Sequence, residues 1–97
     1  MRKLIKENEK VSLLLSKEQI GLIKDHTLAE DNLISALDIV EVSGKQFKVK
    51  YTLHDLEDLE GHVASAANHC DDKKLQDKLD KIFLKIQTVS AKYDLDY

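Results

Sequence analysis

The stretch that decides the fold is residues 53–86, LHDLEDLEGHVASAANHCDDKKLQDKLDKIFLKI, which holds most of the regularly spaced apolar residues of the chain. These residues recur at steps of three and four, the spacing that places side chains on one face of an α-helix. The pattern breaks at Cys70-Asp71-Asp72, and so short a break between two helices favours an antiparallel pair. We therefore predict a C-terminal helical hairpin as the centre of the fold.

The second helix of this hairpin has the clearest pattern. Its apolar stripe follows alternating steps of four and three: Leu75, Leu79, Ile82, Ile86, Val89 and Tyr93. Phe83 widens the stripe, and lysines and aspartates occupy the other faces. Asp71 or Asp72 is a suitable N-cap, because a short acidic side chain accepts hydrogen bonds from the free amide groups of the first turn. The repeat is shorter than three heptads, so we interpret it as a helix in a globular core and not as a coiled coil.

The first helix of the hairpin is expected to begin at Thr52, which resembles a capping box with Asp55 three residues later. One face changes from large to small residues along its length: Leu56, Leu59, Val63, Ala66, Ala67 and Cys70. Small residues let a neighbour approach closely, so we expect the Ala66 end to lie against another helix or the sheet. Gly61 lowers helix stability by about 1 kcal/mol relative to alanine, and we expect a close contact there as well.

Length and composition indicate a single small folded domain over residues 1–97. A chain of 97 residues has no room for a second core. Its net charge of -3 is mild, and its lysines and acids are interleaved, which argues against nucleic acid as a partner. No apolar run approaches the roughly 20 residues needed to cross a bilayer, so we expect no membrane partner. A single cysteine and the lack of an apolar signal core favour a soluble, cytoplasmic protein.

The N-terminal half predicts one strand and two short helices. In residues 11–15, Val11, Leu13 and Leu15 alternate with other residues and should share the buried face of a strand. The sequence from Ser16 to Gln19 matches a capping box at the start of a helix that carries Ile20, Leu22 and Ile23. Thr27 and Glu30 form a second capping box, before a helix that carries Leu33, Ile34 and Leu37.

A β-hairpin is predicted from residues 38–42 and 46–51. Phe47, Val49 and Tyr51 alternate with lysines, the pattern of a strand with one wet face. A turn at Ser43-Gly44 would place Val42 opposite Lys45 and Val40 opposite Phe47, whereas a three-residue turn through Lys45 would move Ile39 inward. Both registers remain open from the sequence.

The predicted element order is β-α-α-β-β-α-α, which corresponds to an α+β domain. The first strand joins the hairpin in a three-stranded antiparallel sheet, and helices cover one face of it. Residues 1–10 are mostly charged, and residues 92–97 alternate tyrosine, acid and leucine. We expect both ends to fray, or the tail to pair with an edge as a docking segment.

Only one group of side chains suggests a chemical site. Asp55, Asp58, His62 and His69 lie along one side of the first hairpin helix, and Asp58 and His62 are close enough to share an ion. Three convergent ligands are needed, so a metal site would require His26, His54 or a second subunit. The alternative interpretation is an exposed helical Asp–His pair, with His69 near the helix end where a cation is favoured.

Other groups of residues give weaker indications of a chemical site. Cys70 follows His69 directly, so their side chains diverge on a helix, and we expect a buried, inert cysteine. Ser43-Gly44-Lys45 lacks the spacing of a phosphate-binding loop. Lys45, Lys48 and Lys50 form a small basic face that we interpret as a solvated surface. We therefore expect no catalytic residue, no bound cofactor or metal, and no enzymatic activity.

Leu84 lies on the charged side of the last helix, and with Ala91 and Leu95 it suggests an association surface. The leading hypothesis is a non-enzymatic interaction module that binds a protein partner or forms a homodimer through the C-terminal helical hairpin. The alternative hypothesis is a metal-binding protein centred on Asp58 and His62.

Overall fold

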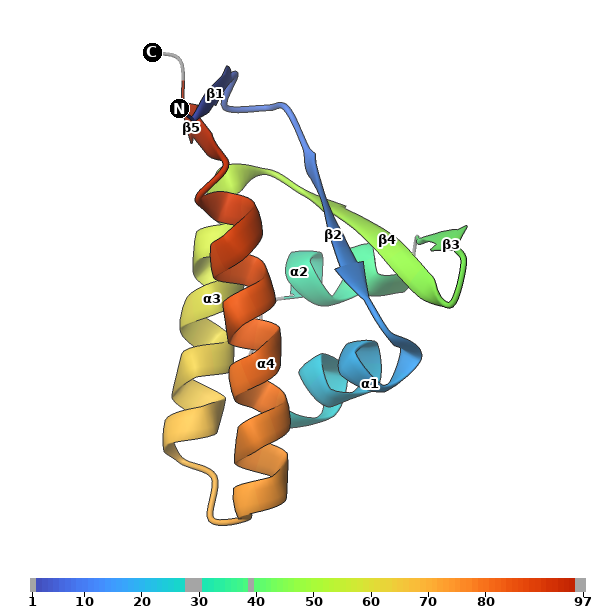
Figure 1. Cartoon of the computed structure of the whole chain (residues 1–97), viewed down its shortest axis with the longest axis vertical. Coiled ribbons are helices and arrows are strands. Elements are labelled where there is room, and N and C mark those ends of the chain that lie inside the picture. The colour runs from blue at the N-terminus through green and yellow to red at the C-terminus, as the bar shows by residue number, and fades with distance from the viewer. Residues whose placement is uncertain (1, 28–30, 39, 96–97) are drawn as a thin grey trace.

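The computed structural model describes residues 2–27, 31–38 and 40–95. Figure 1 shows the elements in chain order: β1 (Lys3–Ile5), β2 (Val11–Leu15), α1 (Lys17–His26), α2 (Asp31–Ser35), the 3-10 turn η1 (Ala36–Asp38), β3 (Glu41–Ser43), β4 (Gln46–Tyr51), α3 (Leu53–Asn68), α4 (Lys73–Ser90) and β5 (Tyr93–Leu95). The chain has the predicted α+β fold with a C-terminal helical hairpin.

The main sheet has three antiparallel strands in the order β2-β4-β3, as predicted, so β4 is central. Val11 pairs with Tyr51, Leu13 with Val49, and Leu15 with Phe47. Because side chains alternate between the two faces of a strand, these pairs share one face. Val11, Leu13 and Leu15 are buried as predicted, whereas Leu14 is exposed on the opposite face.

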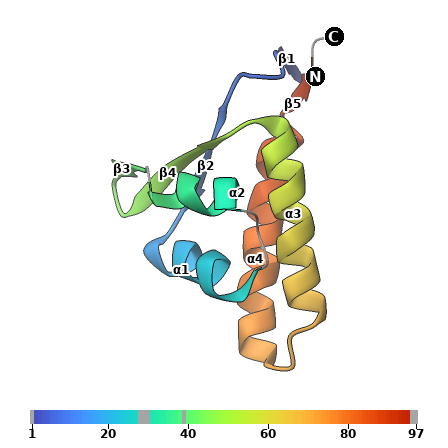
Figure 2. The ribbon, with the colours of Figure 1, turned by 180° about the vertical axis from the view of Figure 1, so that it is seen from behind.

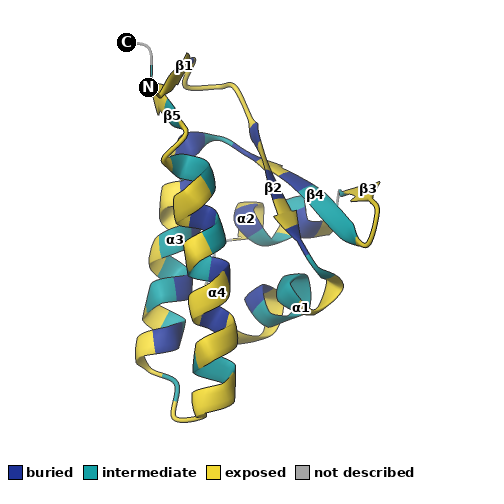
Figure 3. Cartoon of the chain, in the orientation of Figure 1, coloured by how far each residue is buried: buried dark blue, intermediate teal, exposed yellow. Residues whose placement is uncertain are grey.

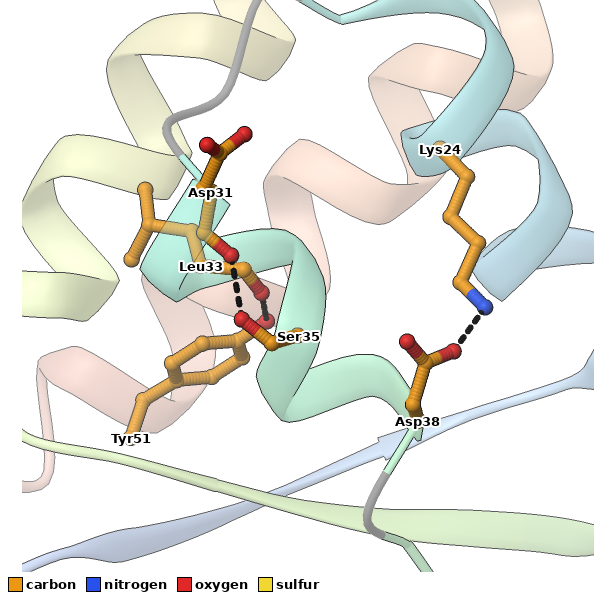
Figure 4. Close-up of polar contacts among 6 residues, drawn as sticks. All are labelled: Lys24, Asp31, Leu33, Ser35, Asp38 and Tyr51. Atoms are coloured by element: carbon orange, nitrogen blue, oxygen red, sulfur yellow. Dashed lines mark hydrogen bonds and ion pairs between the residues drawn. The ribbon is translucent and has the colours of Figure 1, made fainter.

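The two short helices lie on the same side of this sheet in both views (Figures 1 and 2). The buried Tyr51 hydroxyl donates a 2.6 Å hydrogen bond to the carbonyl oxygen of Leu33, which ties β4 to α2. Lys24 of α1 forms an ion pair with Asp38 at the end of η1, and the Ser35 hydroxyl donates to the Asp31 carbonyl oxygen (Figure 4). These contacts fix the layer that covers the sheet.

The N-caps of α1, α3 and α4 lie at residues that the sequence predicts. Gln19 N–H donates to Ser16 Oγ (3.1 Å) and Ser16 N–H donates to Gln19 Oε1 (3.0 Å), a complete capping box for α1. Asp55 N–H donates to Thr52 Oγ1 (3.2 Å) at the start of α3. Of the two candidates for α4, Asp72 is the N-cap, and its carboxylate accepts from the first-turn amides.

The hairpin helices pack along the predicted stripes. Fully buried residues include Leu56, Leu59 and Val63 of α3 and Leu79, Ile82 and Ile86 of α4. Near the small-residue end of α3, the carbonyl oxygen of Ala67 accepts a 3.2 Å hydrogen bond from Gln76 Nε2 of α4. The predicted close contact at Gly61 is wrong, because a Cβ added there would meet nothing within 4 Å.

The β3–β4 register differs from both sequence alternatives. Ser43 pairs with Gln46, Val42 with Phe47, and Glu41 with Lys48, so the turn residues are Gly44 and Lys45. Gly44 has a φ of +63°, and two-residue hairpin turns require a positive φ at such a position. The strand also begins later than predicted, because Ala36–Asp38 form a 3-10 turn. Ile39 lies outside the described residues.

The two ends of the chain pair with each other in the structure. β1 and β5 are parallel, with Lys3 opposite Tyr93 and Ile5 opposite Leu95. Ile5 is buried, which explains why this short pair docks on the end of the hairpin. Of the second predicted capping box, Glu30 lies outside the described residues. Thr27 forms the C-cap of α1.

Candidate functional site

The exposed large apolar side chains point to the candidate site. Among the described residues these are Leu4, Leu14, Val42 and Leu84. Leu14 of β2 is 40% exposed and Leu84 of α4 is 58% exposed, and both line one groove. Figure 3 shows exposed residues on both elements. Two leucines from distant parts of the chain therefore meet at one surface without being buried.

We call this feature the β2–α4 groove. It has a volume of about 590 Å³, and its lining includes the apolar residues Leu14, Leu84 and Val89 and the basic residues Lys81, Lys85 and Lys92. The described residues that line it include no aspartate and no glutamate. The groove is thus apolar and basic, on a chain whose net charge is -3.

Lys85 connects the two walls of the groove. Its Nζ donates a 2.7 Å hydrogen bond to Gln19 Oε1 and a 3.3 Å hydrogen bond to the carbonyl oxygen of Leu14. Gln19 Oε1 also accepts the capping bond from Ser16 N–H, so Lys85 joins α4 to the start of α1. Burial lowers the pKa of Lys85, because a charged ammonium group loses hydration there.

The periodicity of each element explains why these leucines face outward. In β2, Leu13 and Leu15 are on the buried face, so Leu14 is on the other face. In α4, Ile82 and Ile86 face the core, and Leu84 lies off that stripe. Both exposures follow from local patterns, but the meeting of the two leucines is a tertiary feature.

The predicted association surface is divided between two cavities. Leu84 lines the β2–α4 groove, whereas Ala91 and Leu95 line a separate cavity of about 460 Å³ together with Arg2 and Glu57. Leu95 also belongs to β5 and is half-buried. We therefore restrict the association surface to Leu84 and its new neighbour Leu14.

A second hollow lies where the end of α1 meets the hairpin, and we call it the histidine cavity. It has a volume of about 510 Å³ and is lined by His26, His62, Ser65, Ala66, His69, Cys70, Leu75 and Leu79. His69 Nδ1 lies 2.8 Å from the carbonyl oxygen of Ser65. The fold thus brings His26 to the same hollow as His62 and His69, as the metal hypothesis required.

The other proposed ligands lie elsewhere. Asp58 is exposed and does not line the histidine cavity, and no hydrogen bond or ion pair joins Asp58 to His62 in the described structure. His54 instead lies 3.6 Å from Glu7, measured from Nε2 to Oε1. Within residues 2–27, 31–38 and 40–95, no three His, Cys, Asp or Glu side chains form a group able to hold a metal ion. Asp55 is part of the Thr52 cap.

The remaining sequence candidates have ordinary surroundings. Cys70 is half-buried, not buried as expected, and its thiol donates a 3.2 Å hydrogen bond to the carbonyl oxygen of Asp72. In the basic face of Lys45, Lys48 and Lys50, the Lys50 Nζ lies 3.5 Å from Glu41 Oε1. A nearby carboxylate weakens the attraction of this face for phosphate groups.

Comparison with known proteins gives no assignment: no family model matches the chain, and no curated protein or solved structure matches it significantly. None of the described helices combines the length and apolar composition needed to span a bilayer. The functional argument therefore depends on the geometry of the groove and the cavity.

Proposed function

We propose that this chain is a small non-enzymatic protein-interaction module that binds another protein chain through the β2–α4 groove. The observation that carries the proposal is the convergence of Leu14 and Leu84, both exposed, in one groove. Exposed apolar side chains that gather in one place are typical of interaction surfaces, whereas scattered ones are ordinary. The cytoplasm is the compartment we propose, because the chain has a single, unpaired cysteine.

Site-specific photo-crosslinking in the native cells tests this proposal. A benzophenone amino acid at position 84 should give a discrete adduct with one other chain, since that position borders the groove. The matched control is the same amino acid at position 58, which is also an exposed helical position.

A second change connects the adduct to the groove. Leu14→Glu in the position-84 protein should abolish the adduct, because it places a charge on the opposite wall. An adduct that forms equally at both positions, or that survives Leu14→Glu, would contradict the assignment of the groove as the binding surface.

The alternative proposal is a metal-binding protein, and one observation favours it. His26, His62 and His69 come from different parts of the chain and line one cavity, and imidazole nitrogens are common ligands of zinc. Asp58 is no longer part of this proposal, since it lies outside the cavity.

Thermal unfolding in Zn²⁺ or Ni²⁺ decides between the proposals, because a ligand that binds only the folded chain raises Tm. A rise in Tm that is lost in His62→Ala and retained in His54→Ala would support the metal proposal. An unchanged Tm at metal concentrations well above that of the protein would eliminate it.

A further inference from the structure

The structure assigns a chemistry to the partner: we propose that the β2–α4 groove binds an acidic, extended segment of another protein. One apolar side chain of this segment lies between Leu14 and Leu84, and a neighbouring carboxylate binds Lys85 and Lys81. This inference rests on the proposed function and specifies its partner.

The charges of the groove favour an acidic segment. Some lysines elsewhere in the described chain lie beside carboxylates, such as Lys24 beside Asp38 and Lys78 beside Glu18 at 3.4 Å. In the described part of the chain, the three groove lysines have no such partner, and Lys85 donates only to neutral oxygens. A carboxylate from outside would supply the missing negative charge and form stronger, charge-assisted hydrogen bonds.

The backbone of β2 favours an extended segment. β2 lies at the edge of the sheet, because the strand order is β2-β4-β3. The carbonyl oxygen of Leu14 accepts from Lys85 of α4, so it faces the groove and not β4. In an antiparallel strand the backbone groups of alternate residues face the same side, so those of Ser12 face the groove as well. Because α4 packs along this edge and Lys85 already bonds to the Leu14 carbonyl oxygen, a bound segment has the Ser12 backbone groups as hydrogen-bond partners in addition to the groove side chains.

The same charges disfavour a second copy bound groove to groove. Such a contact would bring Lys81, Lys85 and Lys92 of both copies together, with no carboxylate from the described groove lining between them. Like charges that meet in an interface reduce affinity and exclude the wrong partner. We therefore infer a different chain as the partner.

Fluorescence anisotropy with short labelled probe peptides tests the inference on the full chain. The probe is Glu-Leu-Glu-Leu-Glu, and the matched peptides are Lys-Leu-Lys-Leu-Lys and Glu-Ser-Glu-Ser-Glu. The acidic apolar peptide should bind at least about tenfold more tightly than either matched peptide, a difference that corresponds to ~1.4 kcal/mol. Equal binding of the basic peptide would overturn the inference.

Charge reversal at the surface localises the binding. Lys81→Glu should weaken binding of the acidic peptide about tenfold, because it replaces an attraction with a repulsion at an exposed position. The matched control is Lys73→Glu, an exposed lysine of the first turn of α4 that does not line the groove. Both variants should be fully folded at the temperature of the binding measurement, which thermal unfolding checks. Equal weakening by both variants would show that only net charge matters and would overturn the inference.

Two further outcomes distinguish the ways in which the inference can fail. Binding to vesicles of phosphatidylserine and phosphatidylcholine, without binding to the acidic peptide, would indicate an anionic membrane surface and overturn the peptide inference. A position-84 crosslink to another protein, without acidic-peptide binding, would leave the interaction module intact and overturn the partner chemistry. Loss of both signals would contradict both proposals.

Discussion

The two halves of α4 line two hollows of similar volume. The hollows differ in how far the core already buries the leucines that line them. The first half contributes Leu75 and Leu79 to the histidine cavity, and the second half contributes Leu84 to the β2–α4 groove. Leu79 is fully buried, whereas Leu84 is 58% exposed. Binding in the groove would bury Leu84, a side chain that folding has left in water, whereas Leu79 in the cavity is already buried by the core. The groove is therefore the better candidate for association.

The largest expected effect separates the leucines of the two hollows. Leu79→Ala should lower the free energy of unfolding by about 3 kcal/mol, because it leaves a space in a packed core. Leu84→Ala should change it by less than about 0.5 kcal/mol, as expected for a surface position. Urea denaturation of both variants measures the difference. A comparable loss in Leu84→Ala would show that Leu84 belongs to the core and would break the contrast between the hollows.

Tyr51 provides a reference outside both hollows. Tyr51→Phe should lower the free energy of unfolding by about 1–2 kcal/mol, because the buried Leu33 carbonyl oxygen loses its hydrogen bond from the Tyr51 hydroxyl. Binding of the acidic probe peptide should not change, so stability and groove function would be separable. A parallel loss of binding would show that the peptide measurement reports stability.

The pH dependence of stability tests the burial of Tyr51 separately. Burial, with a smaller contribution from the negative charge of Asp55, raises the pKa of the Tyr51 hydroxyl well above its usual value near 10. The stabilising contribution is therefore complete below pH 10 and is lost at higher pH, when the unfolded chain ionises first. From pH 9 to 11 the wild type should lose about 1.4 kcal/mol more than Tyr51→Phe. Equal losses of unfolding free energy in the wild type and Tyr51→Phe, measured by urea titration at each pH, would contradict the burial of the Tyr51 hydroxyl.

A smaller loss of stability is expected when Lys85 in the groove or His69 in the histidine cavity loses its hydrogen bonds. Lys85→Met keeps the aliphatic stem but removes the bonds to Gln19 and Leu14, and it should lower stability by about 0.5–1 kcal/mol. His69→Ala loses one exposed contact and should cost less than about 0.5 kcal/mol. Thermal unfolding tests whether Lys85→Met lowers stability more than His69→Ala does.

The sign of the pH dependence at Lys85 is opposite to that at Tyr51. Burial lowers the pKa of Lys85 in the folded chain, so the unfolded chain retains the proton at higher pH. The wild type should therefore gain stability relative to Lys85→Met as the pH rises toward the ordinary lysine pKa. A relative loss over that interval would show that the charged form is favoured in the folded groove.

Local patterns were sufficient for most of the fold. The capping box from Ser16 to Gln19 involves neighbours in the chain, and its two hydrogen bonds form as the sequence predicts. The period of four and three in α4 likewise determines which face is buried. In β2, the period of two correctly places Leu13 inside. Such features depend on residues within one helical turn or a few strand positions.

Features that depend on distant segments could not be predicted in the same way. The start of β3 could not be read from alternation alone, because Ala36–Asp38 form a 3-10 turn that packs against β4, and the hairpin register follows from a turn at Gly44-Lys45. The parallel pairing of Lys3–Ile5 with Tyr93–Leu95 joins segments at opposite ends of the chain. For the candidate site, the α4 pattern shows Leu84 as an apolar residue off the stripe, but no local pattern connects it with Leu14. The alternation in β2 gave the only available signal, the outward direction of Leu14.

The most direct test of the groove is a ¹H–¹⁵N NMR titration of the full chain with the Glu-Leu-Glu-Leu-Glu peptide. Our account expects the largest amide shift changes at Leu14 of β2 and at Leu84 and Lys85 of α4, which line the two walls of the groove. His26 and His62, which line the histidine cavity, should be unchanged. Shift changes confined to the cavity, with none in the groove, would contradict the assignment of the β2–α4 groove as the binding surface.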